Sequence, residues 1–219
     1  MFTGIVEEVG TVRALRRGAH SATLSIGAHT VLENTRLGDS IAVNGVCLTV
    51  TSLDPNQFSA DVMHETLRHS NLCSLHAGSP VNLERAMAAD GRFGGHVVSG
   101  HIDAVGTILR IQRDDNAVWY TIDADERTLR HIIMKGSIAI DGISLTVARL
   151  ARDSFAVSII PHTRAETTLP TKQIGDEVNL ETDLIGKYVE RFLATPSSPP
   201  STAVDSGGIT RSFLATHGF

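Results

Sequence analysis

The sequence lacks long apolar runs and any surplus of basic residues. No apolar stretch approaches the roughly 20 residues that a helix needs to cross a bilayer. The N-terminus carries Glu7 and Glu8, whereas a signal peptide would have a basic segment followed by an apolar one. The formal net charge is −5, which argues against nucleic acid or an anionic membrane as a partner. We therefore expect a cytoplasmic protein.

Cysteines and aromatic residues are scarce. Cys47 and Cys73 are the only cysteines, so a disulfide framework is not expected. Aromatic residues make up 5% of the chain, which leaves few platforms for stacking nucleic acid bases. The ten histidines form no His-Glu-x-x-His motif and the cysteines no Cys-x-x-Cys motif, so we expect no metal site.

Two catalytic motifs are also missing. Residues 91–96 are glycine-rich, but the segment lacks the Gly-Lys-Ser/Thr ending of a phosphate loop. A Gly-x-Ser-x-Gly nucleophile elbow is absent as well. We interpret residues 91–96 as a link between two halves of the chain.

An internal repeat organises the sequence. Residues 2–12 return as residues 98–108, so that Gly4 corresponds to Gly100. Residues 41–50 return as residues 138–147, and Val-Asn-Leu-Glu occurs at both 81–84 and 178–181. One register held across separated blocks indicates two copies of the same domain.

Each copy reads as β-structure. Asn44-Gly45 and Asp141-Gly142 lie between alternating apolar runs, which is typical of a tight hairpin whose central residues need positive φ. Residues 58–62 and 155–159 alternate with period two, as half-buried strands do. Short strands separated by turn residues predict a small closed barrel in each half. A helical turn is expected near residues 65–68 and 164–166.

The spacing changes to helical after the second copy. Leu184, Tyr188 and Phe192 share one face, with further apolar residues beside them. We expect this stripe to pack against other subunits, the alternative being that it covers the chain's own barrels. Prolines and serines follow from residue 196, and the rest of the chain is expected to be a flexible tail.

The two copies differ at two chemically important positions. In the strand after each hairpin turn, apolar residues alternate with small polar ones, and the polar face should point outward. On that face Cys47 corresponds to Ser144, while His101 corresponds to Ile5 in the segment before each barrel. A site made from two different halves would therefore hold both a thiol and an imidazole. A buried structural cysteine and a structural histidine are the simpler alternatives.

Together these motifs resemble the riboflavin synthase family. The resemblance rests on Met-Phe-Thr-Gly-Ile-Val at the start and on the segments at residues 44–50, 65–68, 94–101, 141–147 and 160–163. It runs to about residue 194. It implies an all-β fold, with six-stranded Greek-key barrels over residues 1–96 and 97–183, an oligomerisation helix over 184–194 and a flexible tail over 195–219.

The resemblance also implies an activity. Members join two 6,7-dimethyl-8-ribityllumazine molecules into riboflavin and 5-amino-6-ribitylaminouracil, moving a four-carbon unit without metal or cofactor. Three chains assemble through their helices, and the two lumazines meet between barrels of neighbouring subunits. Cys47 and His101 would then complete one site from two chains. The tail offers a further expected contact, docking to lumazine synthase, against the simpler reading of a disordered end.

Site residues follow from the same resemblance. We predict that His101 and Thr146 assist proton transfer at one lumazine, that Cys47 and Ser40 activate the other, and that Phe2 closes the site. The predicted catalytic residues are Ser40, Cys47, His101, Thr146 and Asp183. Ring and ribityl contacts, many through the backbone, are expected from Phe2, Gly4, Ile5, Val6, Cys47, Leu48, Thr49, Asp61, Val62, Met63, His64, Glu65, Thr66, Gly100, His101, Ile102, Lys135, Ser144, Leu145, Thr146, Ser158, Ile159, Ile160, Pro161, His162 and Thr163.

Two other functions share parts of these features. A non-catalytic antenna protein that binds lumazine or flavin would have the same duplicated barrels, but such relatives tend to lose catalytic side chains. Phe2, Ser40, Cys47 and His101 are all present here, which favours the enzyme. The flavin-binding barrel of a reductase would need a nicotinamide-binding domain, and no Gly-x-Gly-x-x-Gly unit occurs.

Overall fold

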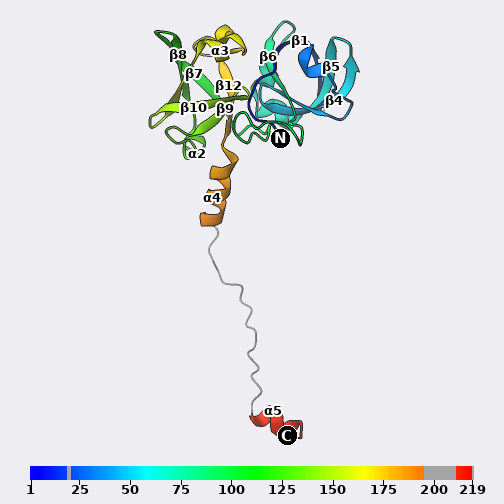
Figure 1. Ribbon diagram of the computed structural model, residues 1–219, viewed down its shortest axis with the longest axis vertical. Helices are drawn as coiled ribbons and strands as arrows, with labels where there is room; N and C mark the ends of the chain where they lie inside the picture. Colours follow the sequence, from blue (N-terminus) through cyan, green and yellow to red (C-terminus); the bar gives the residue numbers. More distant parts are fainter. Residues whose placement is uncertain (19–20, 195–210, 219) are drawn as a thin grey trace. The chain divides into compact units, whose positions relative to one another are not determined.

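The chain forms two closed barrels in tandem. The computed structural model describes residues 1–18, 21–194 and 211–218 (Figure 1). In the first barrel the strands follow the order β1-β2-β5-β4-β3-β6, and β6 returns beside β3, which is a Greek-key connection. The strands are β1 (Glu8–Arg17), β2 (Ser21–Gly27), β3 (Ser40–Val43), β4 (Val46–Asp54), β5 (Gln57–Met63) and β6 (Pro80–Arg85).

The second barrel repeats this topology. Its closed order is β10-β11-β8-β7-β12-β9, so β12 lies beside β9 just as β6 lies beside β3. The six-stranded Greek-key fold expected from the resemblance is confirmed. The strands are β7 (Ala104–Asp114), β8 (Ala117–Asp123), β9 (Ser137–Ile140), β10 (Ile143–Leu150), β11 (Ser154–Ile159) and β12 (Glu177–Thr182).

The predicted hairpin turns join β3 to β4 and β9 to β10. Asn44 and Gly45 have φ of 45° and 80°, and Asp141 and Gly142 have 46° and 78°. All four residues therefore lie in the left-handed region that a type I′ turn requires. These turns set the register that places Val46, Leu48 and Val50 in the core and Cys47 on the opposite face.

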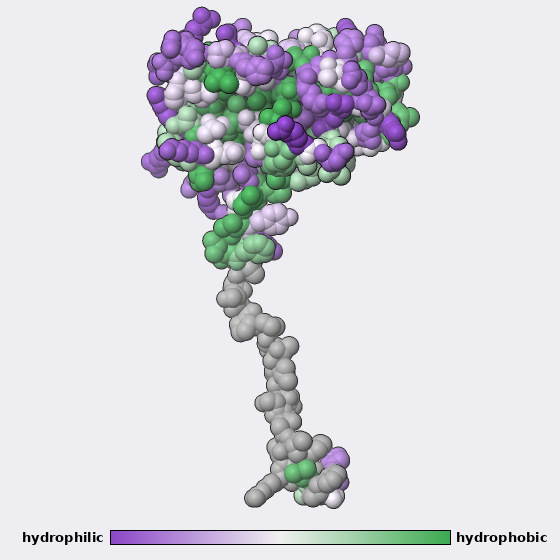
Figure 2. All heavy atoms as spheres, in the orientation of Figure 1, coloured by the Kyte–Doolittle hydropathy of each residue, from purple (hydrophilic) through white to green (hydrophobic). Residues whose placement is uncertain are grey.

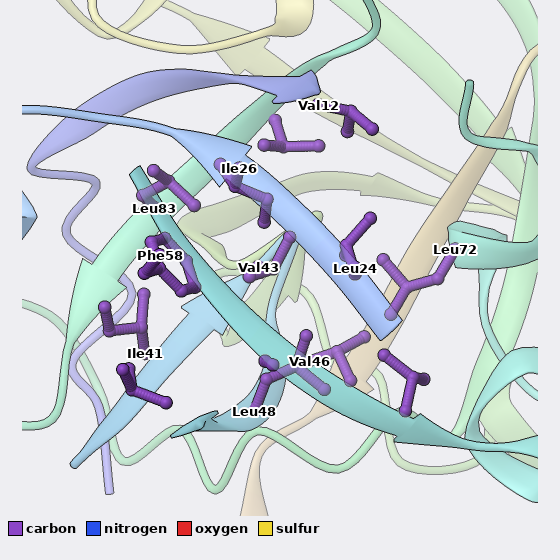
Figure 3. Close-up of a cluster of buried hydrophobic side chains, with 14 of the residues drawn as sticks. Val12, Leu24, Ile26, Ile41, Val43, Val46, Leu48, Phe58, Leu72 and Leu83 are labelled. Carbon is purple, nitrogen blue, oxygen red and sulfur yellow. The ribbon is translucent and has the colours of Figure 1, made fainter. Parts of the chain in front are cut away.

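Each barrel has its own apolar core. The first is filled by branched aliphatic side chains from all six strands together with Phe58, and Figure 3 shows these side chains pointing toward one another. The second is filled in the same way around Phe155 and Tyr120. Two separate cores explain why each repeat folds as a complete barrel.

Short helices connect the strands. The expected helical turns are present as α1 (His64–Arg68) and α3 (Pro161–Ala165), each directly after the equivalent strand. The second barrel also contains α2 (Glu126–Leu129), for which the Asp125 side chain is the N-cap. The 3₁₀ segments are η1 (Thr30–Leu32), η2 (Asn71–Ser74) and η3 (Leu169–Thr171).

The barrels meet turn against turn. A Cβ on Gly45 would lie 2.7 Å from the Gly142 amide nitrogen, and the reverse holds for Gly142, so the two hairpin tips touch. Buried polar groups surround this contact. The Asn179 side chain donates to the Asn44 carbonyl at 2.8 Å, and Asn82 donates to the Asp141 carbonyl at 2.9 Å. The repeated Asn-Leu-Glu motif thus supplies an equivalent bond in each direction.

The chain divides into two compact units, Met1–Lys187 and Tyr188–Phe219. The predicted helix is α4 (Leu184–Ala194), in which the rings of Tyr188 and Phe192 stack 6.2 Å apart. Five of its apolar side chains are more than half exposed, and much of this helix is green in Figure 2. They are Ile185, Tyr188, Val189, Phe192 and Leu193.

The flexible tail expected over residues 195–219 stays a prediction. Residues 195–210 and 219 lie outside the described residues, but Arg211–Thr216 form α5. No proline or glycine interrupts this short segment, and its residues permit a helix. Among the described helices, none combines the length and apolar character needed to cross a membrane.

Candidate active site

Each barrel is preceded by a short segment that lies on the other barrel. We call residues 3–6 the first lead-in and residues 99–102 the second lead-in. The carbonyl of Gly4 accepts a hydrogen bond from the Ser144 amide on β10 at 2.7 Å. In the same way the carbonyl of Gly100 accepts from the Cys47 amide on β4 at 2.8 Å. The polar face of each hairpin strand is therefore completed by the opposite half of the chain.

The apolar residue that ends each lead-in anchors it. Val6 packs against the core of the second barrel, and Ile102 packs against the core of the first. Burial of an aliphatic side chain of this size contributes about 1.5–3 kcal/mol when it is complete. The exchange is reciprocal, so the two barrels hold each other in one arrangement.

Both lead-ins need glycine where they cross the strand. Gly4 and Gly100 have φ of 75° and 87°. A Cβ on Gly4 would lie 2.7 Å from the Ser144 Cβ, and one on Gly100 would lie 2.6 Å from the Cys47 Cβ. Only a residue without a side chain allows this approach together with a positive φ.

Two buried carboxylates hold the lead-ins in place. Glu84 accepts from the Thr3 amide and hydroxyl at 2.7 and 2.9 Å and from the Gly4 amide at 3.0 Å. Glu181 accepts from the Ser99 amide and hydroxyl at 2.6 and 2.8 Å and from the Gly100 amide at 3.0 Å. Burial raises the pKa of the Glu84 carboxyl, and the hydrogen bonds from Thr3 and Gly4 oppose that rise.

A cavity of about 360 Å³ lies where the second lead-in crosses β4. It holds Cys47 and His101 together, and the short helix α1 closes one side through Glu65 and Thr66. The His101 side chain is exposed, with Nδ1 3.3 Å from the Ser99 hydroxyl. We call this cavity the first half-site. Its lining residues are Val46, Cys47, Glu65, Thr66, His69, Ser70, Gly100, His101 and Ile102.

The expectation that Cys47 and His101 need two chains to meet was wrong. They come from different halves of the chain, as the repeat comparison predicted, but the second lead-in brings His101 onto β4 of the same chain. Phe2 is fully buried, forms a β-bridge with Val98 and belongs to a small apolar cluster against which Cys47 packs. It therefore supports the half-site from within, and its closure of the occupied site stays a prediction.

Ser40 lies in a different cavity. It is opposite Thr49 across β3 and β4, on the same face as Cys47, but it lines a larger space of about 690 Å³. That space is bordered by the buried Glu84 and by the side chain of Arg85, which pairs with Glu7. Ser40 therefore lines a different cavity from Cys47 and His101, although the strand register makes it a diagonal neighbour of Cys47 on the same face.

The equivalent surface on the second barrel centres on Ser144, and we call it the second half-site. The Ser144 hydroxyl lies 2.7 Å from Nδ1 of His96, a buried side chain. Ile5 of the first lead-in stands where His101 stands in the first half-site, and it is exposed. Thr146 is also exposed, two residues along β10 from Ser144. The second half-site therefore has the Ser144 hydroxyl and the buried His96 imidazole where the first has the Cys47 thiol and the exposed His101 imidazole.

Several predicted contact residues have side chains that cannot face a ligand. Leu48, Val62 and Ile159 are buried in the cores, so only their backbone groups are available, in line with the expected backbone contacts. Met63 and the equivalent Ile160 are exposed at the ends of β5 and β11. Leu145 packs partly into the second core. The remaining predicted contact residues near the ends of β5 and β11 and in the helices that follow are exposed or half-buried: Asp61, His64, Ser158, Pro161, His162 and Thr163.

Two further predicted residues have structural contacts. The Asp183 carboxylate accepts from the Ile185 amide at 3.0 Å in the first turn of α4. Lys135 is exposed, with φ of 64°, and its amide donates to the Val147 carbonyl at 2.8 Å. Within the described ranges, no three His, Cys, Asp or Glu side chains are grouped as metal ligands would be.

Sequence reasoning missed Glu84, Glu181 and His96. The two glutamates end the repeated Val-Asn-Leu-Glu motif, and an acidic residue on an otherwise buried strand was a signal that could have identified them. His96 was assigned to a simple link between the barrels. It is instead buried, and its amide donates to the Thr3 carbonyl at 3.1 Å.

Comparison with known proteins agrees with this architecture. The lumazine binding domain matches residues 3–86 and again residues 99–183. The chain is 54% identical to riboflavin synthase of Actinobacillus pleuropneumoniae over 220 residues, covering 100% of both chains. The chain belongs to the riboflavin synthase family. Riboflavin synthase of Bacillus subtilis is 48% identical over 219 residues, again with full coverage of both, and that of Meyerozyma guilliermondii is 42% identical over 93% of this chain and 94% of the relative.

Solved structures with the same fold are more distant in sequence. LumP complexed with riboflavin superposes with a TM-score of 0.78 at 24% identity, covering 83% of this chain and 99% of that one. LumP complexed with 6,7-dimethyl-8-(1'-D-ribityl) lumazine gives 0.75 at 23% identity with the same coverage. Both show that the riboflavin synthase family and LumP share the tandem-barrel fold.

Proposed function

We propose that this chain converts two molecules of 6,7-dimethyl-8-ribityllumazine into riboflavin and 5-amino-6-ribitylaminouracil. The observation that carries the proposal is the first half-site, where Cys47 and His101 line one cavity of about 360 Å³. The full-length identity to riboflavin synthases supports it independently. The two substrates contain all the atoms of the two products, so the reaction needs no external oxidant or reductant.

Each half-site would bind one lumazine. Two fused rings must lie face to face for the four-carbon unit to pass between them, so positioning supplies much of the rate. The two half-sites of one chain lie on different barrels, and Ser144 and Cys47 both face outward from their strands. We therefore infer that the first half-site of one chain faces the second half-site of a neighbour.

A trimer is part of this proposal. Five large apolar side chains of α4 are more than half exposed, and so many exposed apolar groups on one helix are unusual for a monomer surface. Three such helices would bury these side chains against one another. Sedimentation should then give three times the chain mass of 23.4 kDa, and replacing Phe192 with Glu should shift it toward one.

We infer that His101 takes part in the proton transfer that starts the reaction. Loss of a proton from the C7 methyl of a lumazine leaves an anion delocalised over the ring, and an exposed imidazole beside that ring can accept the proton. The Cys47 thiol lies at the same half-site, where it can contact the same ring or add to it. Hydroxyls of Ser144 and Thr146 would donate to the ring on the facing barrel. Ser40 and Asp183 are also proposed to contribute to catalysis. The groups that they contact would come from the site formed between neighbouring chains.

The test is incubation of the purified protein with 6,7-dimethyl-8-ribityllumazine alone in chelator-containing buffer. We expect one riboflavin per two lumazines consumed, and loss of that product in His101→Ala. Tight binding of lumazine without riboflavin would overturn the proposal. It would favour a non-catalytic lumazine-binding protein, the second candidate, which the fold shared with LumP supports.

Two finer expectations also belong to the proposal. The C-terminal segment would dock to lumazine synthase, and α5 supplies a folded element that could make the contact. Co-sedimentation of the two enzymes, compared with a chain ending at residue 194, tests this. A cytoplasmic location is supported by two cysteines that are both unpaired.

A further inference from the structure

Among the histidines that the structure describes, His96 is the one buried imidazole that the proposed reaction leaves unused. It is 8% exposed and its Nδ1 lies 2.7 Å from the Ser144 hydroxyl oxygen. Its other ring nitrogen, Nε2, is also buried and has no hydrogen-bond partner within the described residues. A buried polar atom without a partner is rare in folded proteins and calls for a physical reason.

The charge state of the ring follows from its surroundings. Burial lowers the pKa of His96, although the carboxylates of Asp183 and Glu181 are close enough to oppose that effect. The ring is therefore neutral at pH 7, and one of its nitrogens carries a proton while the other carries a lone pair.

The hydrogen-bond pattern selects the tautomer. A proton on Nε2 would leave a buried N–H without an acceptor, which folded proteins avoid more strictly than a buried acceptor without a donor. A proton on Nδ1 is used in the 2.7 Å contact with Ser144. The Ser144 oxygen then accepts, and the hydroxyl proton of Ser144 is left to point away from His96.

We propose that His96 is a positioning residue that makes Ser144 a hydrogen-bond donor toward the lumazine bound on the second barrel. The acceptor would be a carbonyl oxygen or ring nitrogen, where negative charge collects when the ring receives electrons. The proposal rests on the proposed function for its substrate. It gives the second half-site a fixed neutral donor, whereas the first has an exposed imidazole that can exchange protons.

The other tautomer of His96, in the same geometry, would give Ser144 a different chemical role. With the proton on Nε2, the Ser144 hydroxyl would donate to Nδ1, and His96 would act as a base toward a serine nucleophile. The two assignments differ in an observable way because only a base must accept a proton. A neutral amide can replace a fixed donor but cannot replace a base.

The first test is the tautomer itself, which does not depend on activity. Nitrogen-15 shifts of the histidine rings in the full-length protein distinguish a protonated Nδ1 from a protonated Nε2. The His96 signal is identified by its absence in His96→Asn. We expect Nδ1 to carry the proton between pH 6.5 and 8; a proton on Nε2, or on both nitrogens, would overturn the proposal.

The second test uses turnover with 6,7-dimethyl-8-ribityllumazine. His96→Asn keeps an N–H near the Nδ1 position, and we expect its kcat to stay within about three-fold of the wild type, with an unchanged pH profile. His96→Phe and Ser144→Ala should each lower kcat by about 10²-fold, as removal of a donor to developing charge does. The double variant His96→Phe with Ser144→Ala should lower kcat by no more than either single substitution does.

Three results would sink the assignment. They are a His96→Asn variant as slow as His96→Phe, an altered pH profile in His96→Asn, and additive losses in the double variant. A wild-type protein that makes no riboflavin would instead defeat the proposed function, and the nitrogen-15 measurement would still decide the His96 tautomer.

Discussion

The two half-sites share one backbone and differ in their chemistry. In each, a lead-in crosses a hairpin strand, a glycine carbonyl accepts from the strand, and a buried glutamate holds the segment. On this common frame the first half-site carries Cys47 and the exposed His101, and the second carries Ser144 and the buried His96. Duplication thus supplied the scaffold twice, and divergence at a few side chains would allow the two half-sites to treat the two proposed substrate rings differently.

The largest effect is expected from making the lead-ins alike. His101→Ile gives the second lead-in the side chain that the first has at Ile5. Loss of the proposed proton acceptor should lower kcat by about 10²–10⁴-fold, the usual contribution of a general acid or base. Riboflavin formation under saturating lumazine measures it. His29→Ile serves as control, since that exposed histidine of the first barrel lines neither cavity.

The double variant Ile5→His with His101→Ile moves the imidazole from the second lead-in to the first. It tests whether the shared backbone arrangement alone lets an imidazole at this position act in the reaction. The imidazole would then stand beside Ser144 and no longer beside Cys47. We expect no recovery of activity, because the thiol and the imidazole are separated. Recovery to near the wild-type rate would show that the half-sites are interchangeable.

The next effect concerns the close approach of the second lead-in to β4. Gly100→Ala places a Cβ 2.6 Å from the Cys47 Cβ and 2.9 Å from the Phe2 ring. Gly78 also has a positive φ, 94°, but its added Cβ would meet nothing within 4 Å. Gly78→Ala should therefore cost about 1 kcal/mol from strain alone, and Gly100→Ala about 1–3 kcal/mol more from overpacking.

Urea unfolding of both variants gives the comparison directly. Equal losses of unfolding free energy would mean that the lead-in can move away from β4 at no cost. In that case the first half-site would not depend on the contact between the two halves.

A smaller effect is expected at the carboxylate that holds the first lead-in. Glu84→Gln keeps one oxygen acceptor and places an amide N–H₂ where the second accepts, at a cost of about 1–3 kcal/mol. Burial raises the pKa of Glu84, so its stabilising contribution is complete below the ordinary carboxyl pKa and declines as pH rises through the raised value. The difference in unfolding free energy between wild type and Glu84→Gln should therefore be larger at pH 4 than at pH 7.5. A difference that grows with pH would contradict this.

Much of the fold could be predicted from the sequence because it depends on local patterns. The repeat, the Asn44-Gly45 and Asp141-Gly142 turns, and period-two alternation each report on neighbouring residues, and they led to two barrels. The divergence of Cys47 from Ser144 and of His101 from Ile5 also predicted that a thiol and an imidazole from different halves would meet.

The exchange of lead-ins could not be predicted because it joins residues far apart in the sequence through backbone contacts, Cys47 with Gly100 and Ser144 with Gly4. Cys47 meets Gly100 through an amide and a carbonyl, groups that every sequence contains. Without that contact, two chains were the simplest way to unite Cys47 with His101. His96 was missed for another reason: its equivalent would precede Met1, so the repeat comparison gave no partner against which to judge it.

The smallest effect is expected in the pH dependence of the unfolding free energy. It distinguishes the buried imidazole of His96 from the exposed imidazole of His101. Burial lowers the pKa of His96, so the folded protein keeps this ring neutral at pH values where the unfolded chain has begun to bind a proton. Above the ordinary imidazole pKa of about 6.5 both states are neutral and nothing changes. As pH falls below that value, the unfolded state gains protons first, and the wild type loses stability that His96→Asn does not lose. Urea unfolding at pH 7.5 and pH 5.5 should therefore show the free-energy advantage of the wild type over His96→Asn shrinking at the lower pH. An advantage that stays constant or grows would mean that the folded protein accommodates a charged His96, and a charged ring with protons on both nitrogens could exchange protons as His101 is proposed to do.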